Sequence, residues 1–284
     1  LYSQAQNYNN EWIDYSKTYY KFKVGATGLY RIPQSLLATA NLQNVPAEQF
    51  QLWRNGQQIP LYTSVQTGVL GTTDYIEFWG EMNDGKPDNV LYRLPDYQLN
   101  DKYSLESDTA AFFLTVDPNT SVNLRLVPAA NTLPSALPVE PYFMHTQGTY
   151  YKEKINNGYA AVVGEYVYSS SYDIGEGWTQ NNLGTGATSI SNFTNLFPYT
   201  GAGAPTGTLK VNAVGSALNP RQIQIRLNST VIANQSMDFF DYVKTNNTFD
   251  VSQISTGTGL VEIQNNCAIG GDRINVAQVE LTYP

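Results

Sequence analysis

The sequence predicts an all-β protein of two β-sandwich- or barrel-like modules, the second of them jelly-roll-like, with one short helix in the first. Three observations carry this prediction. Apolar and polar residues alternate along several segments, which is the period of a strand with one buried face. Glycine-containing turn signals separate such segments. A proline-rich stretch interrupts the chain near its middle.

The alternation is clearest in residues 20–24, where Tyr20, Phe22 and Val24 fall on one face and two lysines on the other. The same pattern predicts strands over residues 122–126, 209–213 and 222–227. In residues 274–283 the apolar positions change parity near Ala277, because Ile274 and Val276 share one parity and Val279, Leu281 and Tyr283 share the other. This change predicts a β-bulge or a change of sheet.

Turn and cap residues define further elements. The pair Asn55-Gly56 separates two strand-like segments and predicts a type I′ hairpin, because both residues tolerate a positive φ. Residues 25–28 join two strand-like segments in a similar way. Pro33 precedes an apolar stretch at 35–40 and predicts a short helix, since proline is favoured in a first helical turn.

The domain boundary falls between about Pro128 and Gln147, where the prolines repeated as far as Pro141 prevent regular strand pairing. We therefore expect an N-terminal β module over residues 1–140 and a jelly-roll-like β-sandwich over residues 146–284. An uncharged, loop-rich stretch occupies residues 177–209 of the second module.

Composition excludes several functions. The 284 residues carry a net charge of −8 and only 14% charged residues, which argues against nucleic acids and anionic membrane surfaces as partners. One cysteine and one histidine are too few for an internal disulfide or a Cys/His zinc site. No apolar run reaches the roughly 18 residues of a membrane span. This composition is typical of a secreted β protein.

Catalysis has few candidate groups. Cys267 and His145 are the one thiol and the one imidazole, but we expect a buried inert cysteine and a surface histidine, and no catalytic residue. Three carboxylates near tyrosines, Glu165, Asp173 and Glu176, leave a carboxylate-dependent hydrolase open as a third hypothesis.

Binding residues are more plausible in two places. Tyr172, Glu176 and Trp178 combine rings and a carboxylate in one loop, as in a carbohydrate site, where rings stack on sugars. The carbohydrate-binding, adhesive module is therefore the alternative function. No cofactor is expected apart from Ca²⁺, for which Asn83, Asp84 and Asp88 on a glycine-containing loop are the candidate ligands. A solvated Asx-type turn is the better explanation of these residues, because Asn, Asp and Gly favour turns.

The order of several short motifs resembles the non-catalytic N-terminal region of gingipain-like secreted cysteine peptidases, including the sortase-like peptidases of the type IX (Por) secretion system. The motifs are YKFKV at 20–24, GLYRI at 28–32, FQLWRNG at 50–56, DYIEFWG at 74–80, NDG at 83–85, LYR at 91–93, YSL at 103–105, DTAAFFLT at 108–115, GEGW at 175–178 and VELTYP at 279–284. The caspase-like peptidase core of that family, with its His-Gly and catalytic Cys segments, has no counterpart, since Thr146 follows His145.

The resemblance implies a fragment of a longer precursor, secreted or at the cell surface of a Gram-negative bacterium. It implies an accessory region or propeptide that packs against or regulates a downstream peptidase domain, which is then the expected partner. Glycans are the partner class of the alternative function, and the composition argues against nucleic acid and a membrane span. It also singles out Arg31, Trp53, Trp79 and Trp178, although core packing alone would explain the three tryptophans.

Overall fold

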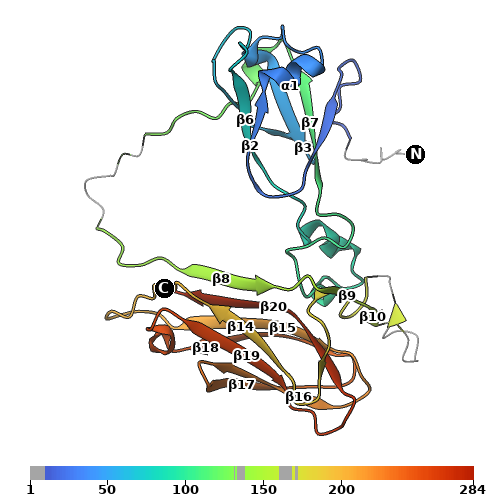
Figure 1. Cartoon of the computed structure of the whole chain (residues 1–284), viewed down its shortest axis with the longest axis vertical. Helices are drawn as coiled ribbons and strands as arrows, with labels where there is room; N and C mark the ends of the chain where they lie inside the picture. Colours follow the sequence, from blue (N-terminus) through green and yellow to red (C-terminus); the bar gives the residue numbers. More distant parts are fainter. Residues whose placement is uncertain (1–9, 131, 133–137, 160–167, 170–171) are drawn as a thin grey trace, which may run out of the picture. The chain divides into compact units, whose positions relative to one another are not determined.

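The computed structural model describes residues 10–130, 132, 138–159, 168–169 and 172–284, and it confirms the all-β prediction (Figure 1). The chain divides into two compact units, Leu1–Asn83 with Ser107–Ser135 and Asp84–Glu106 with Ala136–Pro284. The chain therefore passes between the units three times. The predicted boundary assigned residues 84–106 to the N-terminal module, whereas the structure groups them with the second unit.

The first unit contains two antiparallel sheets. One has the strand order β1-β7-β3-β4 and the other the order β2-β6-β5. The strands are β1 (Tyr20–Val24), β2 (Gly28–Pro33), β3 (Phe50–Arg54), β4 (Gln57–Ile59), β5 (Tyr62–Thr63), β6 (Tyr75–Gly80) and β7 (Ala110–Val116). The helical segments are α1 (Gln34–Thr39), η1 (Ala47–Gln49) and η4 (Thr120–Val122). Alternate residues of both sheets, among them Val24, Phe50, Ile76, Phe78 and Phe112, form its buried core.

Local sequence signals explain most of these elements. Asn55 and Gly56 have φ values of 49° and 75°, so the hairpin between β3 and β4 is of the predicted kind. The short helix after Pro33 is confirmed as α1. Residues 25–28 do not form a hairpin, because β1 pairs with β7 and β2 pairs with β6; the connection leads from one sheet to the other.

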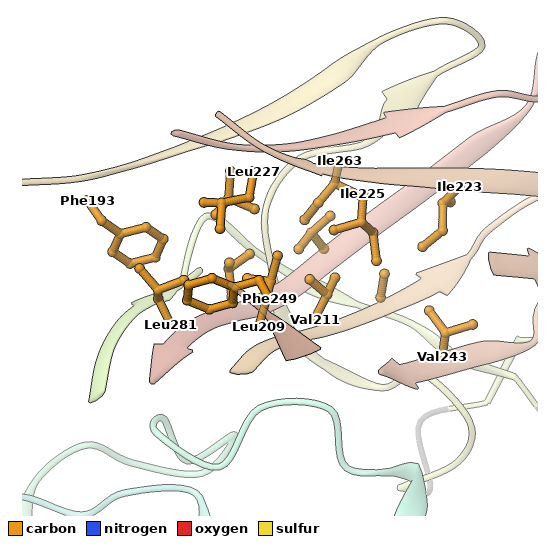
Figure 2. Close-up of a cluster of buried hydrophobic side chains, with 14 of the residues drawn as sticks. Phe193, Leu209, Val211, Ile223, Ile225, Leu227, Val243, Phe249, Ile263 and Leu281 are labelled. Carbon is orange, nitrogen blue, oxygen red and sulfur yellow. The ribbon is translucent and has the colours of Figure 1, made fainter. Parts of the chain in front are cut away.

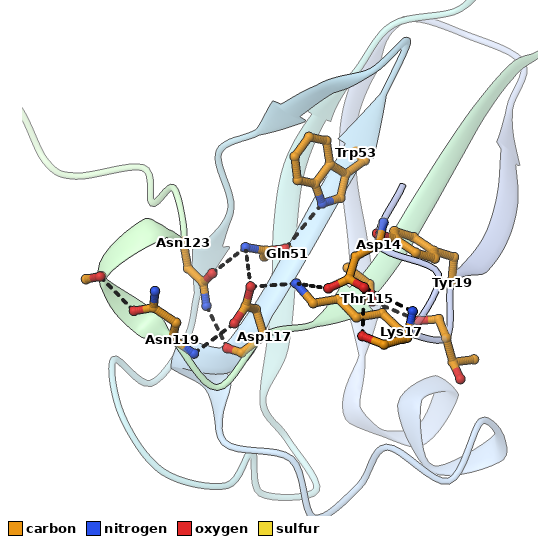
Figure 3. Close-up of polar contacts among 12 residues, drawn as sticks. Asp14, Lys17, Tyr19, Gln51, Trp53, Thr115, Asp117, Asn119 and Asn123 are labelled. Atoms are coloured by element: carbon orange, nitrogen blue, oxygen red, sulfur yellow. Dashed lines mark hydrogen bonds and ion pairs between the residues drawn. The ribbon is translucent and has the colours of Figure 1, made fainter. Parts of the chain in front are cut away.

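The strand predicted over residues 122–126 is wrong. The segment begins in a 3-10 helix and keeps only one bridge, between Leu61 and Arg125. The side chain of Asn123 explains this: its amide nitrogen donates to the carbonyls of Glu48 (2.8 Å) and Asp117 (3.1 Å), and its oxygen accepts from Gln51 (2.6 Å) (Figure 3). Side-chain hydrogen bonds to backbone groups thus replace a ladder here.

The tryptophans do not all pack as expected. Trp53 stacks on Trp12, with ring centroids 5.4 Å apart. Trp79 is 54% exposed, so core packing is the wrong explanation for it: Ile76 and Phe78 of β6 point into the core, and Trp79 points out. Arg31 pairs with Glu77 across the same outer face at 2.6 Å.

The second unit is a β-sandwich of a five-stranded and a four-stranded sheet. The five-stranded sheet has the order β13-β20-β15-β18 with β8 also paired to β20, and the other has the order β14-β19-β16-β17. The strands are β8 (His145–Tyr150), β13 (Leu183–Gly184), β14 (Thr188–Phe193), β15 (Gly207–Gly215), β16 (Arg221–Leu227), β17 (Thr230–Met237), β18 (Tyr242–Phe249), β19 (Gly259–Asn265) and β20 (Arg273–Tyr283). The helical segments of this unit are η2 (Lys86–Leu91), η3 (Pro95–Tyr97) and η5 (Val251–Ile254).

Two small antiparallel pairs complete it, β9 (Lys154–Asn156) with β12 (Gly177–Thr179) and β10 (Gly158–Tyr159) with β11 (Tyr168–Ser169). Inward-facing side chains of the two large sheets meet between them, for example Leu209 and Val211 with Ile223 and Ile225 (Figure 2). The alternation within residues 209–213 and 222–227 is therefore confirmed.

The parity change in the last strand is a β-bulge. Along β20, Gln278 lies opposite Asn212 and Val276 lies opposite Ala213, so Ala277 is the extra residue. The bulge brings Val276 and Val279 into the same core, although they are three residues apart.

Candidate functional site

Residues 84–106 cross the outer face of the five-stranded sheet, and we call this segment the strap. Leu99 of the strap packs against Val214 of β15 and Ala277 of β20. The backbone carbonyl of Leu99 accepts a hydrogen bond from Asn212 Nδ2 at 2.7 Å. Asn212 and Val214 point away from the sandwich core, since Leu209, Val211 and Ala213 point into it. The strap thus covers a sheet face that would otherwise be exposed.

Polar contacts fasten the middle of the strap on either side of Leu99. Asp96 accepts hydrogen bonds from Tyr242 Oη (2.5 Å) and Lys244 Nζ (2.9 Å) of β18, and these two contacts hold the pKa of the Asp96 carboxyl below its ordinary value. Asn100 Nδ2 donates to the carbonyls of Tyr151 (3.2 Å) and Ala277 (3.3 Å). The strap therefore spans the sheet from β18 to the β20 bulge.

The three predicted ligand-binding residues lie in one loop against this strap. Tyr172 donates a hydrogen bond to Glu106 Oε1, and its own carbonyl accepts from the amide of Arg93 at 3.1 Å. Arg93 Nε also pairs with Asp173 Oδ1 at 2.6 Å, and Asp173 is only 2% exposed. Tyr172 has a φ of 56°, which is uncommon for a residue other than glycine, asparagine or aspartate.

Glu176 is buried in the same loop. Its backbone carbonyl accepts from the hydroxyl of Tyr92 in the strap at 2.7 Å, and its Oε2 accepts from the amide of Asp173 at 3.2 Å. Burial raises the pKa of the Glu176 carboxyl, partly opposed by these backbone hydrogen bonds. Burial also raises the pKa of the Tyr92 phenol, with the nearby carboxylate of Glu176 adding to the effect.

Trp178, on β12, is half-buried. Its Nε1 donates to the carbonyl of Ser104 in the strap at 3.0 Å. The Lys152 ammonium lies 5.2 Å from the Trp178 ring and 5.0 Å from the ring of Tyr103, so one cation interacts with both rings. The hydrogen-bonding groups of Tyr172 and Trp178 are thus engaged with the strap. A ligand role for Tyr172, Glu176 and Trp178 stays a prediction.

The geometry of this loop depends on Gly175. Its φ is +76°, and a Cβ placed there would lie 2.6 Å from Val214 Cγ2. Gly175 therefore allows the loop to approach the sheet at the place where the strap's Leu99 also packs.

The calcium candidates are paired with protein groups. Asp88 accepts from Ser104 Oγ (3.1 Å) and the amide of Leu105 (2.8 Å), and Asp84 pairs with Lys86. Asn83 belongs to the first unit, where its Nδ2 donates to the carbonyl of Thr109. Within the described ranges, no group of three or more His, Cys, Asp or Glu is placed to hold a metal ion. The calcium site at Asn83, Asp84 and Asp88 stays a prediction.

The thiol and the imidazole lie at opposite ends of β20. His145 pairs with Tyr283, the last residue of that strand, and Cys267 lies in the loop before Arg273, its first residue. The strand has 11 residues, which corresponds to roughly 33 Å. Cys267 is buried, with its Sγ 3.5 Å from the carbonyl of Pro220, and His145 is exposed. These two residues form no catalytic pair. Glu165, the third hydrolase candidate, lies outside the described residues.

Sequence reasoning missed an aromatic pocket in the second unit. Two triplets line it, Pro141-Tyr142-Phe143 and Phe197-Pro198-Tyr199, together with His145. The signal was present in the sequence, because both triplets combine one proline with two aromatic residues next to strands. Their meeting is a long-range contact that periodicity does not reveal.

No protein-family model matches the sequence, and no curated protein matches it. Among solved structures, dimeric latent PorU from Porphyromonas gingivalis matches 93% of this chain at a TM-score of 0.53 and 12% identity, and the match covers 24% of PorU. A family 36 carbohydrate-binding module in complex with calcium and xylotriose matches 48% of this chain and 98% of its own at a TM-score of 0.30 and 12% identity. The CBM36-1 domain of a multidomain xylanase from the hindgut metagenome of Trinervitermes trinervoides matches 49% of this chain. The match covers 96% of that domain, at a TM-score of 0.29 and 9% identity. This chain thus spans about a quarter of PorU and shares its fold with that part.

Proposed function

We propose that this chain is a non-catalytic accessory region of a larger secreted, gingipain-like cysteine peptidase, and that it packs against or regulates a peptidase domain downstream. The observation that carries the proposal is the likeness to PorU, which extends over 93% of the chain and so includes most of both units. The separation of Cys267 from His145 along β20 supports a role without nucleophilic catalysis.

The connectivity supports a role as a scaffold. The strap belongs to the second unit but lies, in sequence, between two segments of the first. Each unit is therefore built from two separate segments of the chain, with a segment of the other unit between them. Three connections join the two units.

The proposed location is extracellular, at the surface of a Gram-negative bacterium, in a precursor exported by a type IX-like system. The low content of charged residues and the acidic net charge are typical of such proteins. Of the helices among the described residues, none has the length and apolarity to cross a membrane.

A binding experiment tests the accessory role. The chain is mixed with the separately produced caspase-like domain of the precursor, and association is measured by biolayer interferometry and by inhibition of peptide cleavage. We expect binding with a Kd in the micromolar range or tighter, since this is typical of interfaces of standard size. Absence of both binding and inhibition contradicts the proposal.

An exposed apolar pair offers a first variant for this experiment. Leu29 and Trp79 lie opposite each other on β2 and β6, and both are exposed on the outer face of that sheet. Exposed tryptophans are frequent anchors of interfaces, so Trp79→Ala is expected to weaken association about tenfold or more. Tyr15→Ala is the matched control, because Tyr15 is an exposed ring of the same unit outside this sheet.

Glycan binding by the second unit is the second candidate. The observation in its favour is the half-exposed ring of Trp178 beside Lys152, in the loop that the sequence predicts to bind sugars. Trp178→Phe keeps an aromatic face and removes the indole N–H. A glycan array on which Trp178→Phe binds as the wild type does, and Trp178→Ala does not, supports stacking at this residue. Equal binding by all three proteins contradicts it.

A further inference from the structure

The aromatic pocket of the second unit is distinct from the loop that holds Trp178. Its volume is about 750 Å³, within the range of small-molecule sites. The residues that line it are Glu140, Pro141, Tyr142, Phe143, His145, Asn195, Phe197, Pro198, Tyr199, Tyr283 and Pro284. All of them belong to the second unit.

The rings of the pocket are fixed by contacts with one another. Tyr142 stacks on Tyr199, with centroids 5.2 Å apart and planes inclined by 25°. The ring of His145 meets Phe143 and Tyr283 edge to face, at 6.3 Å and 5.6 Å. These contacts involve Tyr142, Phe143, His145, Tyr199 and Tyr283, so a ligand that stacks on Phe143 loses little entropy in ordering that ring.

The loop that supplies one wall is anchored from below. Leu196 is buried in the sandwich core, and its amide donates to the carbonyl of Gly257 at 3.0 Å. The residues on either side of it, Asn195 and Phe197, are exposed, and Phe197 is 86% exposed. The amide of Tyr199 donates to the carbonyl of Pro284 at 2.9 Å. Phe197 is thus an exposed ring on an anchored backbone.

The opposite wall is equally well supported. Phe143, 75% exposed, directly precedes β8, and His145 begins that strand and pairs with Tyr283. Two large apolar rings are therefore presented to solvent from two anchored segments. A cluster of large exposed apolar side chains around a pocket usually marks a binding site, whereas single exposed apolar residues do not.

The chemistry of the lining indicates the ligand. Glu140, Asn195 and His145 offer hydrogen-bond donors and acceptors beside the rings. The described residues that line the pocket include no lysine or arginine, so nothing there neutralises an anionic ligand. A neutral sugar has apolar C–H faces for the rings and hydroxyl edges for these polar groups.

We infer that this pocket binds a neutral oligosaccharide, with Phe143 and Phe197 as the stacking rings. The inference goes beyond the proposed function, because none of the residues that line this pocket belongs to the loop that holds Trp178. It does not depend on the peptidase-accessory role.

The test uses the full chain with five soluble probes: cellohexaose, xylohexaose, mannohexaose, maltohexaose and hexagalacturonic acid. Binding is measured by isothermal titration calorimetry. We expect at least one neutral hexasaccharide to bind, with an affinity that does not fall when NaCl is raised. Phe197→Ala and Phe143→Ala are each expected to weaken binding about tenfold, the effect of one aromatic contact.

Controls separate this pocket from the rest of the chain. Tyr15→Ala removes an exposed ring of the first unit and is expected to bind as the wild type does. Because Phe143 and Phe197 are exposed, their variants are expected to keep the wild-type melting temperature.

Three results overturn the inference. In the first, none of the neutral hexasaccharides binds. In the second, binding survives in the Phe143→Ala/Phe197→Ala double variant or is lost in Trp178→Ala instead. In the third, a decaproline peptide binds, the double variant abolishes its binding, and no neutral sugar competes with it; the pocket would then recognise a proline-rich segment.

Discussion

Replacement of Gly175 by alanine tests whether the loop at residues 172–178 and the strap depend on the close approach to Val214. Gly175 has a φ of +76°, and a Cβ there would lie 2.6 Å from Val214 Cγ2. Gly186 is a matched control, because its φ is +77° and a Cβ there would meet no atom within 4 Å. The two substitutions share the backbone strain and the lost freedom of the unfolded chain, and differ in the clash.

The expected magnitudes follow from these geometries. A left-handed alanine costs about 1–2 kcal/mol, which both variants incur. Overpacking against a buried neighbour costs a further 1–3 kcal/mol or so, which only Gly175→Ala incurs. The second unit should therefore unfold at a Tm roughly 2–12 °C lower in Gly175→Ala than in Gly186→Ala.

Two measurements check this reasoning. Thermal and denaturant unfolding give the stability difference, and hydrogen exchange reports on the amide of Arg93, which donates to the carbonyl of Tyr172. We expect Gly175→Ala to lose protection at Arg93 and Gly186→Ala to retain it. In the Val214→Ala background, which removes Cγ2, Gly175→Ala should cost no more than Gly186→Ala does. Equal losses in the two single variants, or a Gly175→Ala deficit unchanged by Val214→Ala, would refute the reasoning.

Three further predictions concern the second unit. Asp272→Asn leaves the fully buried guanidinium of Arg221 without its carboxylate partner, so the free energy of unfolding measured with denaturant should fall by about 3–5 kcal/mol. The double variant Arg221→Met/Asp272→Leu should recover most of that loss, and a loss below about 1 kcal/mol in Asp272→Asn contradicts the prediction. Burial raises the pKa of the Glu176 carboxyl, so the stability that the protonated carboxyl contributes is greatest in acid and is lost as pH rises through the pKa of the folded state. Glu176→Gln should therefore raise the Tm at pH 7 but not at pH 4; the same change in Tm at both pH values is the contrary result. Trp178→Phe removes the donor to Ser104 and should cost about 1 kcal/mol, with faster hydrogen exchange confined to the strap and its loop; a uniform change across the sandwich opposes it.

Local signals in the sequence predicted the elements that local physics determines. Alternation identified Tyr20–Val24 and the segment at 222–227, a pair of turn residues identified the hairpin at Asn55, and a change of parity identified the bulge at Ala277. Each of these depends on residues within one strand or turn. Alternation failed at Asn123, because a side chain there replaces the ladder with hydrogen bonds to distant carbonyls.

The strap could not be predicted because nothing local distinguishes it. Its contact between Leu99 and Asn212 joins residues 113 positions apart, and its 3-10 helices and turns have no periodicity. The sequence places Tyr172, Glu176 and Trp178 close together in one loop. Their hydrogen-bond partners in the strap, Glu106, Tyr92 and Ser104, are far away in the sequence and could not be predicted from it.

These contacts also bear on how the two units form. The outer face of β15 and β20 carries buried polar side chains, among them Asn212 and Gln278, which a solvent-facing sheet would leave hydrated. The strap supplies a partner for the buried Asn212 Nδ2, the carbonyl of Leu99. In the sequence, Leu99 lies between two segments of the first unit. Folding of the second unit therefore requires a long-range closure through the first, and such closures slow folding relative to contacts between neighbouring strands.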